Sequence, residues 1–478
     1  MSYYDDGRDG EEGGRAYGAG GYGGGSRAYG GRGGYRPRYD RGYDDGGRGG
    51  YGGRNDRGYG GRGRHEDFSY EAMTPAQDDP NFIPNWTTRV DDFDQMDLPP
   101  ALLQGVYSYG FRAPSEIQAI AIGAIRDPSN RHVIAQAQSG TGKTGAFSIG
   151  VLSKIDVSQK TTQALVLAPT RELATQIFNV FKEIGSRIPG LDIAIFIGGA
   201  QRVVDAQARA ASHPHICICT PGRALDLIVS GHLRVQNFKM AVLDEADQML
   251  SDNFIEQVND IMEYFPEDVQ ILLFSATISQ SIFHIMNTFM NDPFRILIKK
   301  EQLTLEGIKQ FYVDVQETSN KFDCLLDIYG SVSIQKAIIF ANSKNAVDYI
   351  SEQLQQHGFG VAPIHAGLDQ LERDRIMRDF RTGTARVLIS TDLLARGIDV
   401  QQVTLVINFE LPKKLEQYIH RIGRSGRYGR KGVAINICDH EDMNVIEMLK
   451  NHYMTTINEL PSDIERVVNE ANAQWDEK

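Results

Sequence analysis

The chain has 478 residues, with 50 Lys and Arg against 62 Asp and Glu and a formal net charge of −12. At about 150 residues per domain, this length predicts two or three domains. The four cysteines form neither a zinc-binding pattern nor a disulfide framework, which favours a reducing compartment. The chain begins without an apolar secretory segment and contains no apolar run near the roughly 18 residues of a membrane span, so we expect neither secretion nor a membrane protein.

Residues 1–64 differ from the rest of the chain in composition. They hold 25 of the 49 glycines, 10 of the 20 tyrosines and 12 arginines, but no lysine and almost no aliphatic residues. Such a segment cannot bury enough apolar surface to offset the entropy lost on ordering, so we predict a disordered tail over residues 1–67. Its arginines and tyrosines suit contact with and stacking on single-stranded RNA. A spacer without a specific role is the alternative.

The remainder of the chain is acidic. The tail has 12 Arg against 9 acidic residues, a net charge of +3, so −15 falls on the rest. An acidic body argues against broad nonspecific binding of polyanions. Any nucleic acid bound there must therefore be held by local side chains and backbone amides.

Short apolar runs alternate with helical stretches from residue 68 onward. In the first half, helices are expected at 171–184 and 255–265, and strands at 132–137, 164–168, 193–197, 215–219, 240–243 and 270–274. This alternation predicts βαβ units around a mostly parallel sheet. Cys217 and Cys219 alternate within one of these strands, so both thiols are expected on one face of the sheet, in the core.

The pattern restarts after a polar stretch. Residues 299–307 read as a hinge, and we place a linker at 301–307 between domains at 68–300 and 308–478. The second half has strands expected at 310–315, 337–340, 387–390 and 405–408, helices at 346–357, 371–380 and 415–422, and a last helix at 463–472. The sequence therefore predicts two α/β domains in tandem.

A glycine-rich loop follows the strand expected at 132–137. Its sequence is Ala137-Gln138-Ser139-Gly140-Thr141-Gly142-Lys143-Thr144, and a helical stretch comes next. Glycines let backbone N–H groups close around phosphates, and the helix N-terminus adds a favourable dipole. Lys143 can then reach the β- and γ-phosphates, and the Thr144 hydroxyl can ligate Mg²⁺. A structural Gly-rich turn is the alternative, because the general pattern has glycine where Ala137 stands.

Adjacent acids end the strand expected at 240–243. Asp244-Glu245-Ala246-Asp247 follows it, and ligands of α/β sheets bind at the C-terminal ends of strands. Carboxylates there suit a nucleoside triphosphatase, in which Asp244 holds Mg²⁺ and Glu245 orients the attacking water. An acidic surface loop is the alternative, and the phosphate loop upstream favours the nucleotide site. Before that loop, an aromatic and the Gln118 amide in Gly110–Gln118 could stack on adenine and bind its edge, although Gln118 alone could be an ordinary helix residue.

These motifs resemble those of the DEAD-box RNA helicases of superfamily 2. Phe93 and Gly110–Gln118 are similar to the adenine-selecting Q motif, placed at 91–119, and the family form of the phosphate loop has alanine where Ala137 stands. The resemblance covers nearly all of residues 90–465, and further motifs follow in family order at Pro169–Ala174, Gly198–Gly199, Thr220–Arg223, Ser275–Thr277, Ile338–Asn342, Gln370 with Arg373, Ser390–Asp392, Ala395–Asp399 and His420–Arg427.

Within that family, the body is most similar to the translation initiation factor 4A subfamily. The similarity is carried by Ala135–Ser139, Leu303–Tyr312, Asp392–Val403 and Glu459–Ile464, and the Gly/Arg-rich tail is an addition to the subfamily pattern. The related helicase of the exon junction complex shares much of the same sequence. The resemblance implies two tandem RecA-like doubly wound parallel-sheet domains.

The resemblance also implies ATP as the nucleotide, Mg²⁺ as its ion, and a role for each matched residue. Catalysis is assigned to Lys143, Asp244 and Glu245, with Arg424 and Arg427 as arginine fingers from the second domain. The residues that bind ATP are Phe93, Phe111, Gln118, Ser139, Gly140, Thr141, Gly142, Lys143, Thr144 and Asp399, and Mg²⁺ is held by Thr144 and Asp244. Coupling of hydrolysis to RNA is assigned to Asp247, Ser275, Thr277 and His420.

RNA binding is assigned to backbone amides and polar side chains that contact phosphate and 2′-hydroxyl groups, which carry little sequence information. These residues are Arg171, Gly199, Thr220, Gly222, Arg223, Asn342, Arg373, Thr391, Arg396 and Gly397. The expected activity is RNA-stimulated ATP hydrolysis with local unwinding of RNA duplexes in translation initiation. We expect a cytoplasmic monomer that acts on mRNA with an initiation-factor scaffold protein. The alternative is an ATP-gated RNA clamp in an exon-junction or other mRNP complex, which would allow a nuclear location.

Overall fold

The computed structural model describes residues 83–137, 140–198, 203–250, 254–278, 280–297, 307–332, 334–392, 403–426 and 431–476. All of them belong to one compact unit, residues 66–478. The predicted tail over 1–67 and all of the predicted linker except Gly307 lie outside the described residues.

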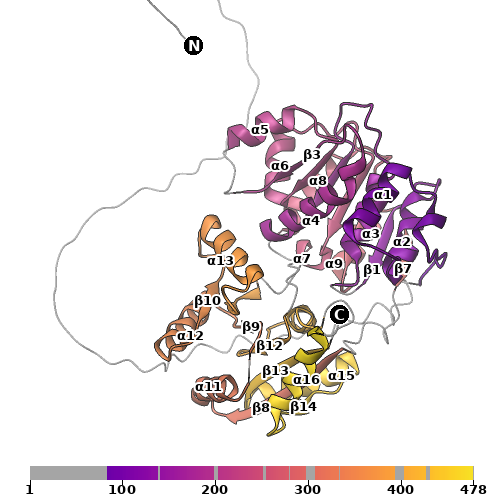
Figure 1. Ribbon diagram of the computed structural model, residues 1–478. Helices are drawn as coiled ribbons and strands as arrows, with labels where there is room; N and C mark the ends of the chain where they lie inside the picture. The colour runs from indigo at the N-terminus through magenta and orange to yellow at the C-terminus, as the bar shows by residue number, and fades with distance from the viewer. Residues whose placement is uncertain are drawn as a thin grey trace, which may run out of the picture. The chain divides into compact units, whose positions relative to one another are not determined.

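A seven-stranded parallel sheet forms the first half (Figure 1). Its strand order is β3-β4-β2-β5-β6-β1-β7. The strands are β1 (Val133–Gln136), β2 (Ala164–Leu167), β3 (Ile193–Phe196), β4 (Ile216–Cys219), β5 (Met240–Asp244), β6 (Gln270–Ser275) and β7 (Phe294–Leu297). The helices are α1 (Pro100–Tyr109), α2 (Glu116–Arg126), α3 (Lys143–Leu152), α4 (Arg171–Ile184), α5 (Val203–Ala211), α6 (Pro221–Val229), α7 (Ala246–Met249), α8 (Ile255–Glu263) and α9 (Gln280–Phe289).

Helices cover both faces of this sheet, because alternate residues of each buried strand point to opposite sides. Helices α1–α4 pack on the face that carries Val133 and Phe274. Helices α5–α9 pack on the other face, where Cys217 and Cys219 both lie buried. The predicted placement of these two thiols on one face is therefore confirmed.

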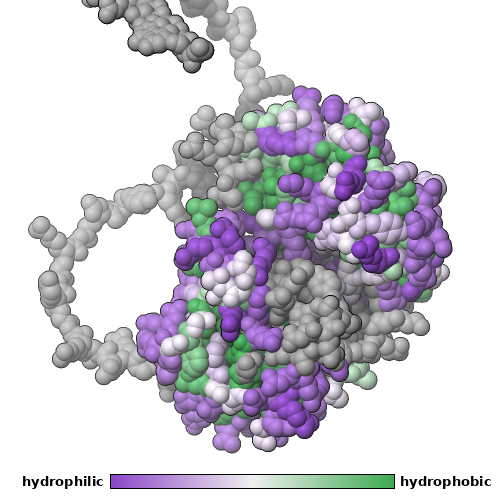
Figure 2. Space-filling model, viewed as in Figure 1, coloured by the Kyte–Doolittle hydropathy of each residue, from purple (hydrophilic) through white to green (hydrophobic). Residues whose placement is uncertain are grey.

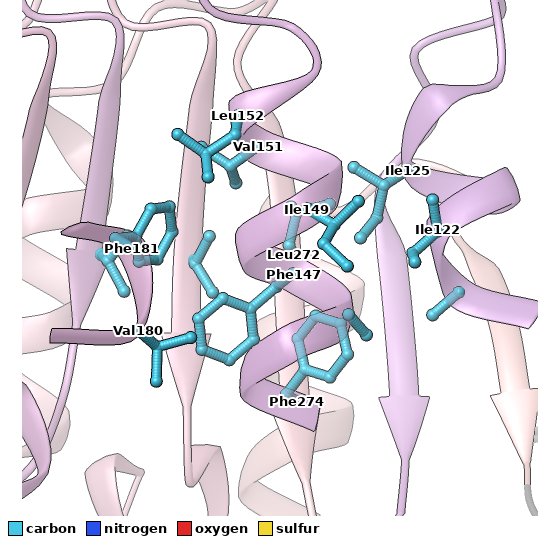
Figure 3. Packing of buried hydrophobic residues seen from close by; sticks show 14 of the residues in the cluster. Ile122, Ile125, Phe147, Ile149, Val151, Leu152, Val180, Phe181, Leu272 and Phe274 are labelled. Carbon is cyan, nitrogen blue, oxygen red and sulfur yellow. The ribbon is translucent and has the colours of Figure 1, made fainter. Parts of the chain in front are cut away.

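Aromatic rings fill the centre of the core between the sheet and α3. Figure 3 shows Phe147 of α3 among the buried residues of α4 and β6. Its ring centroid lies 6.1 Å from that of Phe181 and 5.2 Å from that of Phe274. Burying side chains of this size stabilises a fold by about 1.5 to 3 kcal/mol each. This packing fixes the helix that follows the glycine-rich loop.

The second half repeats the architecture with another seven-stranded parallel sheet, in the order β10-β11-β9-β12-β13-β8-β14. Its strands are β8 (Ile308–Gln316), β9 (Ala337–Phe340), β10 (Val361–Ile364), β11 (Val387–Ser390), β12 (Leu405–Asn408), β13 (Gly432–Asp439) and β14 (Asn458–Glu459). Its helices are α11 (Lys321–Ser331), α12 (Lys344–Gln356), α13 (Gln370–Thr382), α14 (Leu415–Ile422), α15 (Asp442–Tyr453) and α16 (Ile464–Asp476). Helices α13–α15 cover one face and α11, α12 and α16 the other.

The predicted pair of doubly wound, RecA-like parallel sheets is therefore confirmed. Because the helices cover the apolar strands, the described residues on the visible face are mainly hydrophilic, with smaller hydrophobic areas among them (Figure 2). Among the described residues, no helix combines the length and apolar character needed to cross a bilayer.

Candidate nucleotide site and RNA-contact residues

The glycine-rich loop joins β1 to α3, as the sequence predicts. Gly140 and Gly142 have φ values of 85° and 102°, in the left-handed region that glycine adopts without steric cost. Lys143 is the first residue of α3, and its side chain is 5% exposed. Thr141 and Thr144 lie in the same turn, and Ser139 lies outside the described residues. The loop thus directs the first amides of α3 toward the carboxyl end of the sheet.

The strand-end acids lie close to this loop. Asp244 is the last residue of β5, and only β6 separates β5 from β1 in the sheet. Lys143 Nζ lies 3.7 Å from Glu245 Oε1, and both acids are 2% exposed. The backbone N–H of Glu245 donates to Asp244 Oδ1 at 3.0 Å. An acidic surface loop is therefore not what the sequence encodes here.

Glu245 has a strained backbone. Its φ and ψ are both 51°, in the left-handed region, where a residue other than glycine costs about 1 to 3 kcal/mol. The surrounding structure must compensate for that cost, and α7 begins directly after it. Strain of this kind is concentrated at active sites, where it aims a side chain. The strained backbone thus marks Glu245 as a candidate functional residue.

Asp244 is a buried carboxyl whose charged form is disfavoured in the absence of a cation. Burial raises the pKa of the Asp244 carboxyl to about 7, while the Lys143 ammonium opposes the rise and the Glu245 carboxylate adds to it. A divalent cation beside this carboxyl would favour its charged form. A carboxylate and a hydroxyl such as that of Thr144 offer the oxygen ligands that Mg²⁺ prefers. The donor set therefore fits the ion.

Asp247 connects the acid cluster to the second half of the chain. Its Oδ2 accepts a hydrogen bond from Thr277 Oγ1 at 2.8 Å and lies 3.0 Å from His420 Nε2, while its backbone N–H donates to Ser275 Oγ at 3.3 Å. Side-chain ligand atoms of Glu245, Asp247 and His420 all lie within 4.8 Å of one another. The four residues predicted to couple hydrolysis to RNA are thus brought together.

Two arginines of the second half lie buried beside His420. Arg424 is 2% exposed, and its Nε donates to the His420 carbonyl oxygen at 3.1 Å. Arg421 is fully buried and donates to Asp392, Asn342 Oδ1 and the Glu410 carbonyl oxygen. Arg421 therefore joins the segments that follow β9, β11 and β12. The sequence prediction gave Arg421 no role. Its charge lies on an amphipathic helix next to a parallel sheet, and this pattern could have indicated a buried arginine. Arg427 lies outside the described residues.

The Gln118 amide lies against the glycine-rich loop. Its Oε1 accepts from the Ser115 N–H at 2.9 Å, and its Nε2 donates to the Gly142 carbonyl oxygen at 3.3 Å. Phe93 is fully buried and stacks on Phe111, with ring centroids 6.2 Å apart. The three residues predicted to bind adenine thus lie together, although Phe93 has no exposed ring face in this structure. Asp399 lies outside the described residues.

Arg171 and Arg373 take part in contacts between α4 and α13. Arg171 Nη1 donates to Gln370 Oε1 at 3.0 Å, and Arg373 Nη1 lies 3.0 Å from Glu172 Oε1. Gln370 Nε2 lies 3.4 Å from Glu172 Oε1, and Arg373 is 6% exposed. Glu172 and Gln370 are functional candidates that the prediction missed, although both belong to motifs that it quoted. These polar contacts join the two halves at a second place.

The other predicted RNA-contact residues are dispersed over ends of helices and strands. Thr220 precedes α6, and Arg223 pairs with Asp226 at 3.3 Å within that helix. A Cβ added at Gly222 would lie 3.3 Å from Gln257 Oε1, so this glycine leaves little room on that side. Asn342 Nδ2 donates to the Leu411 carbonyl oxygen at 2.8 Å, and the Thr391 carbonyl oxygen accepts from Ser390 Oγ at 2.7 Å. Gly199, Arg396 and Gly397 lie outside the described residues.

Comparison with known proteins assigns both halves to helicase families. Residues 115–285 match the DEAD/DEAH box helicase family, and residues 320–429 match the helicase conserved C-terminal domain. The chain is 48% identical over 385 residues to "ATP-dependent RNA helicase eIF4A" of Debaryomyces hansenii, which covers 80% of this chain and 96% of that protein. It is also 48% identical over 380 residues to "Eukaryotic initiation factor 4A" of Caenorhabditis elegans, covering 80% and 94%.

Solved structures give the same result. The S. cerevisiae protein Dbp5 bound to RNA and ADP BeF3 superposes with a TM-score of 0.75 at 34% identity. The match covers 80% of this chain and 100% of that one.

Proposed function

Because the chain belongs to the DEAD-box family of RNA helicases, we propose that this ATP-dependent RNA helicase unwinds short RNA duplexes in translation initiation. The relatives that carry the name of this initiation factor match four fifths of the chain. The Asp247–His420 hydrogen bond is the observation that supports the mechanism most, because it connects the proposed catalytic acids to the second domain.

Hydrolysis takes place at the loop between β1 and α3. Gly140, Thr141 and Gly142 bind the phosphates together with Ser139, and Lys143 neutralises charge on the β- and γ-phosphates. Thr144 and Asp244 would hold Mg²⁺, which would supply neutralising charge to the phosphate oxygens. Glu245 orients the attacking water and accepts its proton. Gln118 binds the adenine edge, and Phe111 and Asp399 complete the nucleoside site. The buried Phe93 belongs to the site by stacking behind Phe111.

The second domain completes the site from the other side. Arg424, with Arg427, stabilises the charge that develops on the transferred phosphoryl group. A hydrogen-bonded cluster across the two halves transmits the state of this site to bound RNA. In it, Asp247 contacts His420, Thr277 and Ser275. Hydrolysis is therefore expected to depend on RNA.

The predicted RNA contacts keep their role in this proposal. Phosphate or 2′-hydroxyl groups are bound by Arg171, Thr220, Gly222, Arg223, Asn342, Arg373, Thr391 and, outside the described residues, Gly199, Arg396 and Gly397. The side chains of Arg171, Arg223 and Arg373 also contact Gln370, Asp226 and Glu172, so RNA competes with these contacts. The related Dbp5 structure, bound to RNA and ADP BeF3, supports binding of RNA together with ATP. A scaffold protein of the initiation machinery is the proposed partner of a cytoplasmic monomer.

Unwinding and partner capture distinguish this proposal from an RNA clamp. We expect the full chain to separate a short RNA duplex with repeated ATP turnover, and affinity purification from cells to recover a cap-binding scaffold. The chain with Lys143→Ala is the control for ATP-independent strand separation. A long-lived ATP–RNA complex without unwinding, recovered with a splicing complex, would support the clamp instead.

Removal of residues 1–64 tests the tail. This change removes 12 arginines, so we expect weaker affinity for single-stranded RNA at low salt and a shallower dependence of affinity on salt concentration. Fluorescence anisotropy between about 50 and 200 mM salt measures both quantities. A Gly/Ser segment of the same length is the matched control for chain length. If affinity is the same with and without the tail at low salt, the tail is a spacer.

A further inference from the structure

A short segment before the first helix binds both α2 and the free edge of the first sheet. We call residues 85–90 the strap. Asn85 accounts for the edge contact: its N–H donates to the Arg295 carbonyl oxygen at 3.2 Å, and its Oδ1 accepts from the Arg295 N–H at 2.7 Å. Its Nδ2 also donates to the Pro293 carbonyl oxygen at 3.0 Å. Because β7 is the last strand of its sheet, Asn85 satisfies backbone groups that would otherwise face solvent.

The other end of the strap is attached to α2. Trp86 Nε1 donates to the Ile120 carbonyl oxygen at 3.2 Å, and the Val90 N–H donates to the Ala119 carbonyl oxygen at 2.9 Å. Both carbonyls lie inside α2, where the helix's own amides use one lone pair and leave the second available. The Trp86 ring packs on Phe294 of β7, with centroids 4.4 Å apart. Trp86 therefore links helix and strand through one side chain.

The two carbonyls bound by the strap belong to Ala119 and Ile120, the residues immediately after Gln118 in the sequence. On the opposite side, the Gln118 amide is held by the Ser115 N–H and the Gly142 carbonyl oxygen. Space there is tight, because a Cβ added at Gly145 of α3 would lie 2.5 Å from Gln118 Nε2 and 2.9 Å from Phe111 Cζ. A shift of α2 of a few tenths of an ångström would therefore change where this amide points. In a recognition site, the residues that contact the ligand must be held within about 0.5 Å of their binding geometry.

We propose that the strap sets the position of α2, and that Trp86 is thereby a positioning residue for selection of the adenine base. This inference rests on the proposed role of Gln118 in reading adenine. The strap lies upstream of the Q motif placed at 91–119. It acts on the base through the carbonyls of Ala119 and Ile120.

The test compares ATP with GTP in RNA-stimulated hydrolysis by the full chain. For Trp86→Ala we expect the ratio of kcat/KM for ATP over GTP to fall about tenfold, in line with loss of one hydrogen bond and its packing. The change should lie in the KM for ATP, with kcat at saturating ATP and RNA within about twofold of wild type. Trp86→Phe keeps an aromatic ring on Phe294 but loses the indole N–H, so its ATP/GTP ratio should lie between those of wild type and Trp86→Ala. Equilibrium binding of ADP against GDP gives the same comparison without catalysis.

Two further variants separate the outcomes. Tyr264→Ala removes a 47% exposed ring at the end of α8, on the other face of the sheet, and should leave the ATP/GTP ratio unchanged. If Gln118→Ala still prefers ATP as wild type does, the adenine role of Gln118 is wrong, and the inference falls with it. If Gln118→Ala loses the preference while folded Trp86→Ala and Trp86→Phe keep it, the strap serves stability alone and the inference is overturned.

Discussion

Replacing Glu245 with Gln should reduce RNA-stimulated ATP hydrolysis by about 10² to 10⁴ while leaving ATP and RNA binding intact. Glutamine keeps the shape of the side chain but cannot accept the proton of the attacking water. Binding is expected to persist because Lys143 and the phosphate loop are unchanged. Loss of the 3.7 Å ion pair with Glu245 also leaves Lys143 freer to pair with phosphate. Steady-state phosphate release measures turnover, and a fluorescent ATP analogue measures binding.

The matched control is Glu263→Gln. Glu263 is an exposed residue of α8, so its replacement makes the same change in charge and shape away from the site. We expect it to hydrolyse ATP at the wild-type rate. Near-normal turnover in Glu245→Gln would show that another group orients the water. Loss of ATP binding in that variant would instead show that the Glu245 charge maintains the loop, through its ion pair with Lys143.

Much of the first half follows from sequence alone. The strands and helices that carry the phosphate loop and the acids are marked by apolar runs and glycines, so Lys143 and Glu245 were expected at one edge of the sheet. What the sequence did not contain is the strand order, because periodicity identifies the buried faces of a strand and not its neighbours. Strands β7, β10, β13 and β14 were not predicted, and three of these are among the shorter strands of their sheets.

Buried charges were the harder part of the site. The RNA contact of Arg373 stays a prediction, but the sequence did not show that its guanidinium lies 3.0 Å from Glu172 of the other half and is 6% exposed. An arginine in a charged helix such as α13 normally faces solvent, and only the fold brings Glu172 next to it. Arg421 was overlooked for the same reason, since Asp392, Asn342 and Glu410 are distant in sequence. A local pattern can mark such an arginine as buried, but its partners come from segments far apart in the sequence and are set by tertiary structure.

Replacing Arg424 with Ala should abolish stimulation of the ATPase by RNA, a loss of about 10³ to 10⁵ in the stimulated rate. The proposed arginine finger belongs to the second domain, so ATP binding by the phosphate loop should stay close to wild type. ATPase rates with and without RNA measure the effect. Arg378→Ala is the matched control, because Arg378 is an exposed arginine of α13 in the same domain.

Burial of Arg424 makes a second variant necessary. Its side chain is 2% exposed and donates to the His420 carbonyl oxygen, so Arg424→Ala could disturb the end of α14. Arg424→Lys keeps the charge but loses the planar fork that binds two phosphate oxygens. We expect it to fold, to keep the Asp247–His420 contact and to lose most of the stimulation. If Arg424→Lys and Arg424→Ala both fold and RNA stimulates their ATPase as it does in wild type, Arg424 does not act as an arginine finger.

The Glu245→Gln and Arg424→Ala variants should differ in how ATP affects RNA binding, and this difference tests the mechanism. In Glu245→Gln every group that holds ATP, RNA and the second domain remains, so ATP should still strengthen RNA binding while turnover stops. Arg424→Ala removes the group proposed to reach the γ-phosphate from the second domain, so ATP should no longer strengthen RNA binding. RNA affinity measured with and without a non-hydrolysable ATP analogue distinguishes the two. Equal strengthening by the analogue in both variants would mean that Arg424 acts only in chemistry and that His420 and Asp247 join the domains without it.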